Sequence, residues 1–446
     1  MSVVVVGAGP AGVRAVERLV EAGIRPVWIE ESPDGGGRVF QKPPPGFSRD
    51  AKALYGADAA RAQAIHDTVA RLRAQVDWRP GTLVWNLRPG PRLLNTQGPD
   101  GTTQEVPYER VILCTGAMDR ALPIPGWTKP GVTGLGAAQI ALKAQGLAIG
   151  RRVALCGTGP LLLLLAWQLT KAGAPPALVL ESAGWGQTLR AAPGLAWNPV
   201  GALRGLAWRA ALRRKGVRIH AGALPLRVEG ADSAQALLWR DAKGAEHRTE
   251  VDGVAIGYGL KPETQLADLA GVPFAFDTLQ RLWLPERDRA GRTAVPGVYL
   301  AGDGASIGGS VVAELAGTRA ALAVIEDAGQ PVDPLETDMI HRRLWLEARF
   351  RAALERAFPY PAAHAAAMPD ETLLCRCEAI TAGDLRATDA PEVNRGKAFT
   401  RIGMGRCQGR VCGPAGAEVL AAARGCAVQD VGRLRGQMPV KPVVMA

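Results

Sequence analysis

Four cysteines near the C-terminus have the residue type and spacing that could bind a metal ion or a cluster. Cys375 and Cys377 form a C-x-C pair, and Cys407 and Cys412 follow as a C-x4-C pair. Two close pairs of thiolates can hold zinc or an iron–sulfur cluster. A single intervening residue is short for the common zinc knuckle, in which two to four are typical, so the spacing favours the cluster.

The remaining cysteines carry no comparable signal. Cys114 and Cys156 lie in apolar segments that read as strands, and Cys426 stands alone, so all three are interpreted as small packing residues. The total of seven is odd, and the N-terminus has no basic region or cleavage site of a signal peptide. These features argue against a disulfide framework and favour a cytoplasmic protein.

A glycine-rich loop near the N-terminus is the second chemical signal. It follows the apolar run 3–6 and reads Gly7-Ala8-Gly9-Pro10-Ala11-Gly12, and a strand over 26–29 then ends at Glu30. This spacing predicts a βαβ unit that binds a dinucleotide, with the pyrophosphate at the helix N-terminus and the acid on a ribose.

The same pattern returns about 150 residues later with one departure. A strand over 152–156 precedes the loop Gly157-Thr158-Gly159-Pro160-Leu161-Leu162, and the next strand ends at Glu181. Leu162 replaces the third glycine, so we expect the helix to stand off the strand or the loop to be reshaped. The sequence leaves three roles open: an NAD(P)H site, a site for another adenine nucleotide, or a structural remnant.

Length and composition place these motifs in a multi-domain α/β protein. A chain of 446 residues exceeds one hydrophobic core, and 47% hydrophobic with 21% charged residues is an ordinary globular balance. The longest apolar run, 161–167, is too short to span a membrane. The net charge is +11, but the basic cluster at 209–218 reads as a solvated helix face, and no motif suggests nucleic acid.

In order along the chain, these motifs resemble flavoproteins with two nested dinucleotide-binding domains, the glutathione-reductase-like class. The resemblance covers residues 1–330 and implies an FAD site made of Gly7, Gly9, Gly12, Glu30, Gly37, Arg38, Thr115, Gly116, Gly302 and Asp303. It predicts an FAD domain at 1–118 and 292–330 and a second nucleotide-binding domain at 119–291. That class often carries a redox-active cysteine pair, which is missing here, so disulfide reduction is not expected.

The C-terminal block resembles the [2Fe-2S] domain of the bacterioferritin-associated ferredoxin type, a small helical fold. We therefore expect a helix and linker at 331–370 and a cluster domain at 371–446. The order of domains is similar to that of the FAD- and [2Fe-2S]-containing α subunits of bacterial heteromeric amino-acid dehydrogenases. This group includes the larger chains of opine oxidase, D-hydroxyproline dehydrogenase and hydrogen cyanide synthase that carry these cofactors.

This resemblance implies an electron-transfer component of a hetero-oligomer that relays electrons from a partner flavoprotein. The expected partners are a D-amino-acid-oxidase-like β subunit, together with a small ferredoxin-like γ subunit, and ATP or NAD(P) is expected at the second nucleotide site. No general base is assigned, because the histidines (66, 220, 247, 341 and 364) are scattered and read as surface residues. The alternatives are a stand-alone NAD(P)H-dependent flavin reductase and a non-enzymatic scaffold. A peripheral position at the inner membrane also fits.

Overall fold

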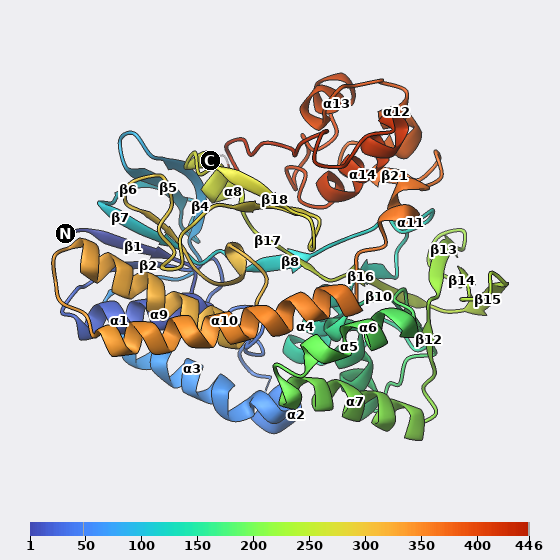
Figure 1. Ribbon diagram of the computed structural model, residues 1–446, viewed down its shortest axis with the longest axis horizontal. Helices are drawn as coiled ribbons and strands as arrows, with labels where there is room; N and C mark the ends of the chain where they lie inside the picture. Colours follow the sequence, from blue (N-terminus) through green and yellow to red (C-terminus); the bar gives the residue numbers. More distant parts are fainter. Residues whose placement is uncertain (48, 445–446) are drawn as a thin grey trace.

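Two five-stranded parallel sheets form the centres of two domains in a computed structural model that describes residues 1–47 and 49–444 (Figure 1). The first sheet has the order β20-β7-β1-β2-β3, and its neighbours run parallel. Its strands are β1 (Val3–Val6), β2 (Val27–Ile29), β3 (Asp77–Arg79), β7 (Arg110–Leu113) and β20 (Val298–Leu300). The sheet therefore takes its edge strand β20 from far along the chain, which makes the second domain an insertion.

The second sheet has the order β12-β11-β10-β16-β9 and is also parallel. Its strands are β9 (Val132–Gly134), β10 (Val153–Thr158), β11 (Leu178–Glu181), β12 (Ile219–Ala221) and β16 (Gly253–Tyr258). Strands β10 and β16 are buried along their whole length, as expected for parallel strands covered on both faces. The expected α/β fold with two nested Rossmann-like sheets is confirmed.

Shorter antiparallel pieces complete the two domains. The first domain carries β4 (Leu83–Arg88), β5 (Leu93–Gln97) and β6 (Thr103–Pro107), and the second carries β13 (Leu224–Glu229), β14 (Ala236–Arg240) and β15 (Glu246–Glu250). Strands β8 (Ala117–Asp119) and β17 (Leu260–Pro262) pair where the chain crosses between the domains. A hairpin of β18 (Phe274–Asp277) and β19 (Leu282–Pro285) follows.

Helices cover the sheets, and one of them runs along both domains. In the first domain α1 (Pro10–Glu21) packs on α9 (Ser310–Asp327) and α3 (Ala59–Leu72). Helix α10 (Pro334–Ala357) packs against α9 at one end and α6 (Trp185–Leu195) at the other (Figure 1). The remaining helices of these domains are α2 (Ala51–Tyr55), α4 (Leu135–Ala144), α5 (Pro160–Lys171), α7 (Pro199–Arg214) and α8 (Gln265–Leu269).

The C-terminal part forms a small, mainly helical unit. It contains α11 (Ala362–Ala366), the ribbon β21 (Leu373–Cys375) with β22 (Ile380–Thr381), α12 (Ala382–Arg386), α13 (Val393–Thr400) and α14 (Cys412–Arg424). The chain then returns to the first domain, where Val440 joins the core under β4 and Val444 bonds Gln97. The last residues of the predicted cluster domain therefore pack on the first domain.

The border between the first two domains lies earlier in the structure than the predicted residue 291. Residues Leu266, Ala270 and Val272 pack in the core of the first domain together with Val4 and Leu300. No helix within the described residues is long and apolar enough to cross a membrane.

Candidate functional site

The first glycine-rich loop joins β1 to α1 with its backbone tightly packed. Gly7 has φ +105°, and a Cβ placed there would lie 2.3 Å from the carbonyl oxygen of Cys114. A Cβ on Gly12 would lie 1.8 Å from the Gly7 carbonyl oxygen. Gly9, which caps the helix, is different: its nearest neighbour would be the Gly37 Cα at 3.7 Å. The space in front of Gly9 and the N-terminus of α1 is therefore open, as a bound pyrophosphate requires.

Two acids stand on either side of this loop. The Glu30 carboxylate accepts hydrogen bonds from the backbone N–H groups of Ala8 (2.5 Å) and Ser32 (2.7 Å) and is 8% exposed. The Asp303 carboxylate accepts the N–H groups of Gly308 (2.8 Å) and Gly309 (3.0 Å), just before α9. Both carboxylates are thus fixed by backbone donors at the ends of parallel strands.

Four segments that are distant in sequence meet at this loop. A Cβ on Gly302 would lie 2.8 Å from the Ala11 Cβ, and one on Gly304 would lie 2.4 Å from the Thr115 hydroxyl oxygen. Arg38 is exposed, and its recorded contact is Gln41 at 3.5 Å. The predicted residues therefore come together, with the Arg38 side chain at the rim. An open cradle at a helix N-terminus flanked by two acids fits an FAD.

The second loop has the same backbone features but a different cover. A Cβ on Gly157 would lie 1.7 Å from the Gly257 carbonyl oxygen, so this turn also requires glycine. Gly159 has φ +94°, and its nearest neighbour would be the Cβ of Phe358 at 3.9 Å. Phe358 caps the C-terminus of α10, so this helix end lies over the cradle that a nucleotide phosphate would occupy.

Leu162 is accommodated in the core below this loop. Its side chain is fully buried among Leu135, Leu155 and Leu165, in the cluster that β10, α4 and α5 share. Glu181 at the end of β11 is also fully buried and accepts the N–H groups of Gly159 (3.1 Å) and Ala183 (3.0 Å). Burial raises the pKa of Glu181 to about 7.

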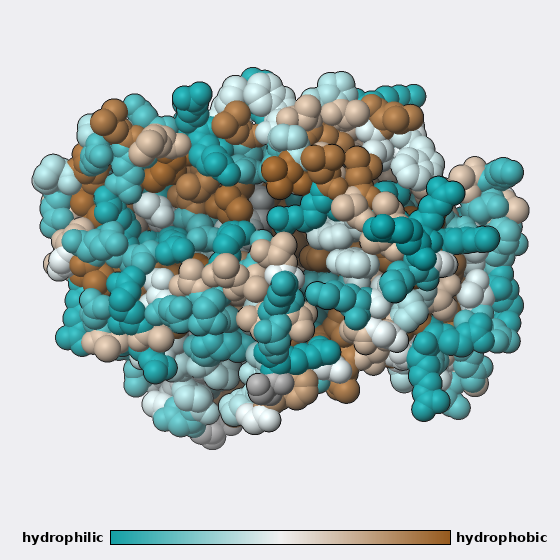
Figure 2. Space-filling view, turned by 90° about the horizontal axis from the view of Figure 1, so that it is seen from below, coloured by the Kyte–Doolittle hydropathy of each residue, from teal (hydrophilic) through white to brown (hydrophobic). Residues whose placement is uncertain are grey.

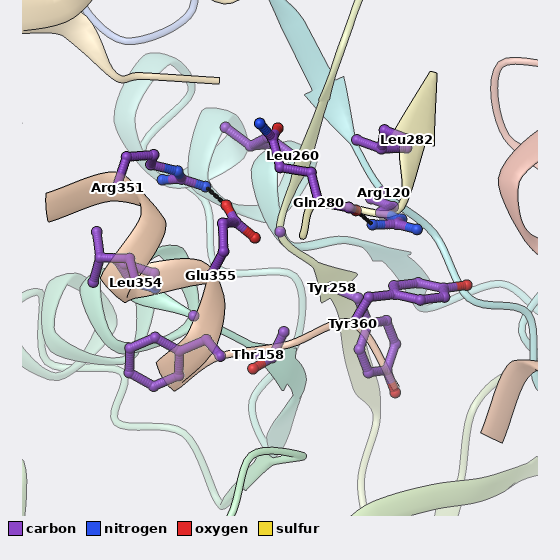
Figure 3. Close-up of a pocket in the computed structure, with 14 residues that line it drawn as sticks. Arg120, Thr158, Tyr258, Leu260, Gln280, Leu282, Arg351, Leu354, Glu355 and Tyr360 are labelled. Atoms are coloured by element: carbon purple, nitrogen blue, oxygen red, sulfur yellow. Dashed lines mark hydrogen bonds and ion pairs between the residues drawn. The ribbon is translucent and has the colours of Figure 1, made fainter. Parts of the chain in front are cut away.

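A pocket lies between the second loop and α10 (Figure 3). Arg120, 4% exposed, has its guanidinium 3.6 Å above the Tyr360 ring and donates to the carbonyl oxygens of Gln280 (2.6 Å) and Arg281 (3.0 Å). Its Nε and the hydroxyls of Tyr258 and Tyr360 are buried without a hydrogen-bond partner among the described residues. Unpaired buried donors are costly, so the pocket suits a polar or anionic group.

The four candidate ligand cysteines lie together in the C-terminal unit. The thiols form a hydrogen-bonded chain in the order Cys375, Cys412, Cys407 and Cys377. A bond with Cys412 and backbone N–H donors lower the pKa of Cys375 to about 6, and the bond with Cys412 lowers that of Cys407 to about 5. Sulfurs that accept backbone N–H groups are typical of iron–sulfur sites.

In residues 1–47 and 49–444, no group of three or more His, Cys, Asp or Glu side chains is arranged to hold a metal ion. The set of thiols is therefore observed, while the cluster remains a prediction. The donor chemistry of four cysteines in two pairs, with backbone N–H groups on the sulfurs, fits a [2Fe-2S] cluster.

A buried ion pair connects the cysteine loop to the first nucleotide site. Arg410 lies between Cys407 and Cys412, and its guanidinium donates to the Glu263 carboxylate at 2.5 and 3.0 Å. The two side chains are 8% and 15% exposed. The same guanidinium donates to the carbonyl oxygens of Cys407 and Val440.

The backbone of Glu263 completes this connection. Its N–H donates to the Gly116 carbonyl oxygen (2.9 Å), and its carbonyl accepts the Thr115 hydroxyl (2.5 Å). The cysteine loop is therefore one ion pair away from the turn that the FAD motif predicts to lie on the flavin.

Sequence reasoning missed Arg120, Phe358, Arg410 and Glu263. None of them belongs to a spacing motif, although a charged residue inside the C-x4-C loop could have drawn attention to Arg410. Two interpretations were wrong. His66 is buried, with its Nε2 2.7 Å from the Phe40 carbonyl oxygen, because α3 packs its face onto the loop after β2. Cys426 is exposed, because it follows the left-handed C-cap Gly425 that ends α14 at the surface.

The comparisons with known proteins agree with this geometry. Residues 1–330 match the family described as pyridine nucleotide-disulphide oxidoreductase. The chain belongs to this family and is an FAD-dependent oxidoreductase.

Its relatives define the group more narrowly. Over 99% of its length it is 35% identical to the larger opine oxidase component of Agrobacterium tumefaciens (strain Ach5), of which it covers 90%. It is 30% identical over 99% of its length to the hydrogen cyanide synthase component HcnB of Pseudomonas protegens, of which it covers 96%. The L-proline dehydrogenase of P. horikoshii shares the fold over the whole chain, with a TM-score of 0.73, 20% identity and 78% of that chain covered.

Proposed function

We propose that the chain is the electron-transfer flavo-iron–sulfur subunit of a heteromeric amino-acid or imino-acid dehydrogenase. The observation that carries the proposal is the Arg410–Glu263 ion pair, which holds the cysteine loop against the Thr115–Gly116 turn. Full-length relatives named as subunits of opine oxidase and hydrogen cyanide synthase support the heteromeric assembly. The substrate class is accordingly the opine, hydroxyproline or glycine type.

The first glycine loop, with Glu30 and Asp303, would hold FAD, and the four clustered cysteines would hold a [2Fe-2S] cluster. A flavin accepts one or two electrons and a cluster passes one, so together they can connect a two-electron oxidation to a one-electron chain. The task of the residues described here is positioning. Gly9 leaves room for the pyrophosphate, Glu30 receives the ribose hydroxyls, and Arg410 fixes the cysteine loop to the flavin domain.

Oxidation of the substrate is assigned to the partner flavoprotein. Around the first site we identify no exposed base with a supporting hydrogen-bond partner among the described residues. The proposed partner is a D-amino-acid-oxidase-like flavoprotein (the β subunit), and a small ferredoxin-like γ subunit is proposed to complete the complex. The chain would deliver the electrons to the next acceptor.

The second nucleotide site is proposed to hold an adenine nucleotide, such as ATP, without turnover. Phe358 covers the Gly159 cradle, and the end of α10 lies where NAD(P)H would have to extend toward the flavin. Arg120, with its unpaired Nε in the pocket, would face a phosphate. The site is thus enclosed by the chain itself, which disfavours rapid exchange of a nicotinamide cofactor.

Anaerobic reduction of the purified protein tests the function. The chain is co-expressed with a D-amino-acid-oxidase-like flavoprotein from the same gene cluster and compared with the chain alone. We expect flavin bleaching and a paramagnetic cluster signal on adding a D- or imino-acid substrate to the complex, and no change in the chain alone. Bleaching of the isolated chain by NADH at a turnover-competent rate would establish the alternative, a stand-alone reductase.

A further inference from the structure

Helix α7 carries an apolar stripe on the wrong side for a core helix. Val200, Leu203 and Leu206 recur at three-residue spacing and are 66%, 64% and 60% exposed. Of the sixteen residues of α7, Leu212 is the buried one. A stripe at this spacing is normally buried against another element, so these side chains suit a surface that the chain itself does not supply.

Neighbouring elements extend this stripe into one face. Trp185 and Leu189 on α6, Trp197 before α7, and Trp345 on α10 are each at least 45% exposed. We call these four residues together with Val200, Leu203 and Leu206 the Trp/Leu face. The elements are continuous, because the Trp197 and Trp345 rings lie 5.7 Å apart and α6 packs on α10. Brown patches interrupt the hydrophilic surface on the side of the molecule drawn in Figure 2, which is viewed from below Figure 1.

Guanidinium groups hold the aromatic rings of this face. Arg349 lies 4.8 Å from the Trp197 ring centre and 4.0 Å from that of Trp345, and Arg209 lies 4.9 Å from that of Trp185. Cation–π contacts of this kind fix large side chains before a partner arrives. Trp and Arg are also the residues most enriched in the energetic centres of protein–protein interfaces.

The charge around the face has one sign. No Asp or Glu occurs between Ser182 and Val228, whereas that segment contains Arg190, Arg204, Arg209, Arg213, Arg214, Lys215, Arg218 and Arg227. The recorded acidic contact to this rim is Asp58, 3.7 Å from Arg204. Much of the net charge of +11 therefore lies in the segment that carries the face.

We propose that the Trp/Leu face is the docking surface for the partner flavoprotein, which presents an apolar centre with an acidic rim. This inference rests on the proposed function for the existence of that partner. An apolar centre surrounded by charge of one sign supplies affinity in the middle and steering at the edge. Seven large side chains on three packed elements exceed the scattered exposed apolar residues of an ordinary surface.

Two other occupants fit the face less well. A second copy of the chain on a twofold axis would bring the basic rim against itself, which is repulsive. A membrane would draw Arg349 and Arg209 into the apolar layer with the rings they cover, because each guanidinium lies over an indole. A protein with acidic side chains can pair with the same guanidiniums.

The test replaces an apolar residue of the face by a charged one and follows assembly. Leu203→Glu and Leu206→Glu place an acid on the exposed face of α7, where neither side chain contributes to the core. The matched control is Leu335→Glu at the start of α10, ten residues from Trp345 and 72% exposed. Each chain is co-expressed with the D-amino-acid-oxidase-like flavoprotein, and the affinity of the purified proteins is measured by titration.

We expect Leu203→Glu to weaken binding of the partner at least tenfold, with Leu335→Glu unchanged and with flavin content and melting temperature unaltered in all three. Unweakened binding by both Leu203→Glu and Leu206→Glu, beside a wild type that binds, would overturn the docking surface and leave the proposed function intact. A wild type that does not bind the flavoprotein would overturn both. Self-association lost in Leu203→Glu, or co-sedimentation with anionic vesicles that the flavoprotein does not displace, would overturn the assignment in favour of a second copy or a membrane.

Discussion

The Arg410–Glu263 ion pair makes the attachment of the cysteine loop testable. Arg410→Met keeps the length of the side chain but removes the guanidinium, so the Glu263 carboxylate loses both hydrogen bonds and remains buried. Removing one partner of a buried pair costs about 3–5 kcal/mol. We use about 3 kcal/mol because Glu263 keeps 15% of its side-chain surface. That value corresponds to a shift of roughly 150-fold in the equilibrium between attached and detached loop.

Amide hydrogen exchange is the assay for this shift. We expect faster exchange in the segment 403–412, which contains the cysteine loop, while the strands of the first sheet stay protected. In the protein loaded with flavin and cluster, electron exchange between the two should slow at least tenfold. The reason is that the loop carrying Cys407 is no longer fixed beside the Thr115–Gly116 turn. Iron content and the visible spectrum should stay unchanged, because no cysteine is altered.

Arg433→Met is the matched control for this variant. Arg433 forms a comparable pair with Asp268, at 2.7 Å for both hydrogen bonds, and also attaches the C-terminal part to the first domain. It bonds neither Cys407 nor Glu263, so it should loosen the end of the chain without slowing electron exchange to the same degree. The double variant Arg410→Met with Glu263→Met should recover most of the lost protection, since replacing both partners is often neutral. Unchanged exchange in Arg410→Met would refute the reasoning.

Four further outcomes are expected. Gly9→Val fills the open cradle, so the protein should purify without yellow colour, and full FAD occupancy would contradict the first site. Cys407→Ser should remove the cluster, seen as lost iron and lost paramagnetic signal, while substrate still bleaches the partner flavin. The folded pKa of Glu181 lies near 7, above its value of 4.5 in the unfolded chain, so stability should fall by about 3 kcal/mol as pH rises from 4.5 to 7, and Glu181→Gln should abolish this slope in urea unfolding. Phe358→Ala should open the second cradle, and we expect tighter binding of ADP by calorimetry; unchanged affinity would exclude Phe358 as the cover.

The parts of the fold that glycine dictates were predictable from the sequence. At Gly7 and Gly12 the backbone approaches within distances that no side chain tolerates, so the spacing of the motif follows from the turn itself. The buried strands around them read as continuous apolar runs because parallel strands are covered on both faces. Local chemistry and global fold agree there, which is why the first site could be assembled from its motifs.

The cover of the second site could not be predicted in the same way. Phe358 is about two hundred residues from Gly159 in sequence, and nothing near it forms a motif. Its position depends on where α10 ends after packing along α9 and α6, which is a tertiary result. Leu162 shows the same limit: its spacing indicated a changed loop, but only the packing shows that its side chain fills the core of β10, α4 and α5.

Helix α10 links the two sites and the exposed surface. Its first half packs on α9 of the flavin domain, its last turn covers the second cradle, and Trp345 in between joins the Trp/Leu face. A partner that binds this face would therefore contact the helix that closes the nucleotide pocket. Because α10 also carries Arg349 across two indoles of the face, a shift of this helix would change pocket and surface together. The proposed nucleotide thus has a structural role available to it, since it would hold α10 in the position that the partner recognises.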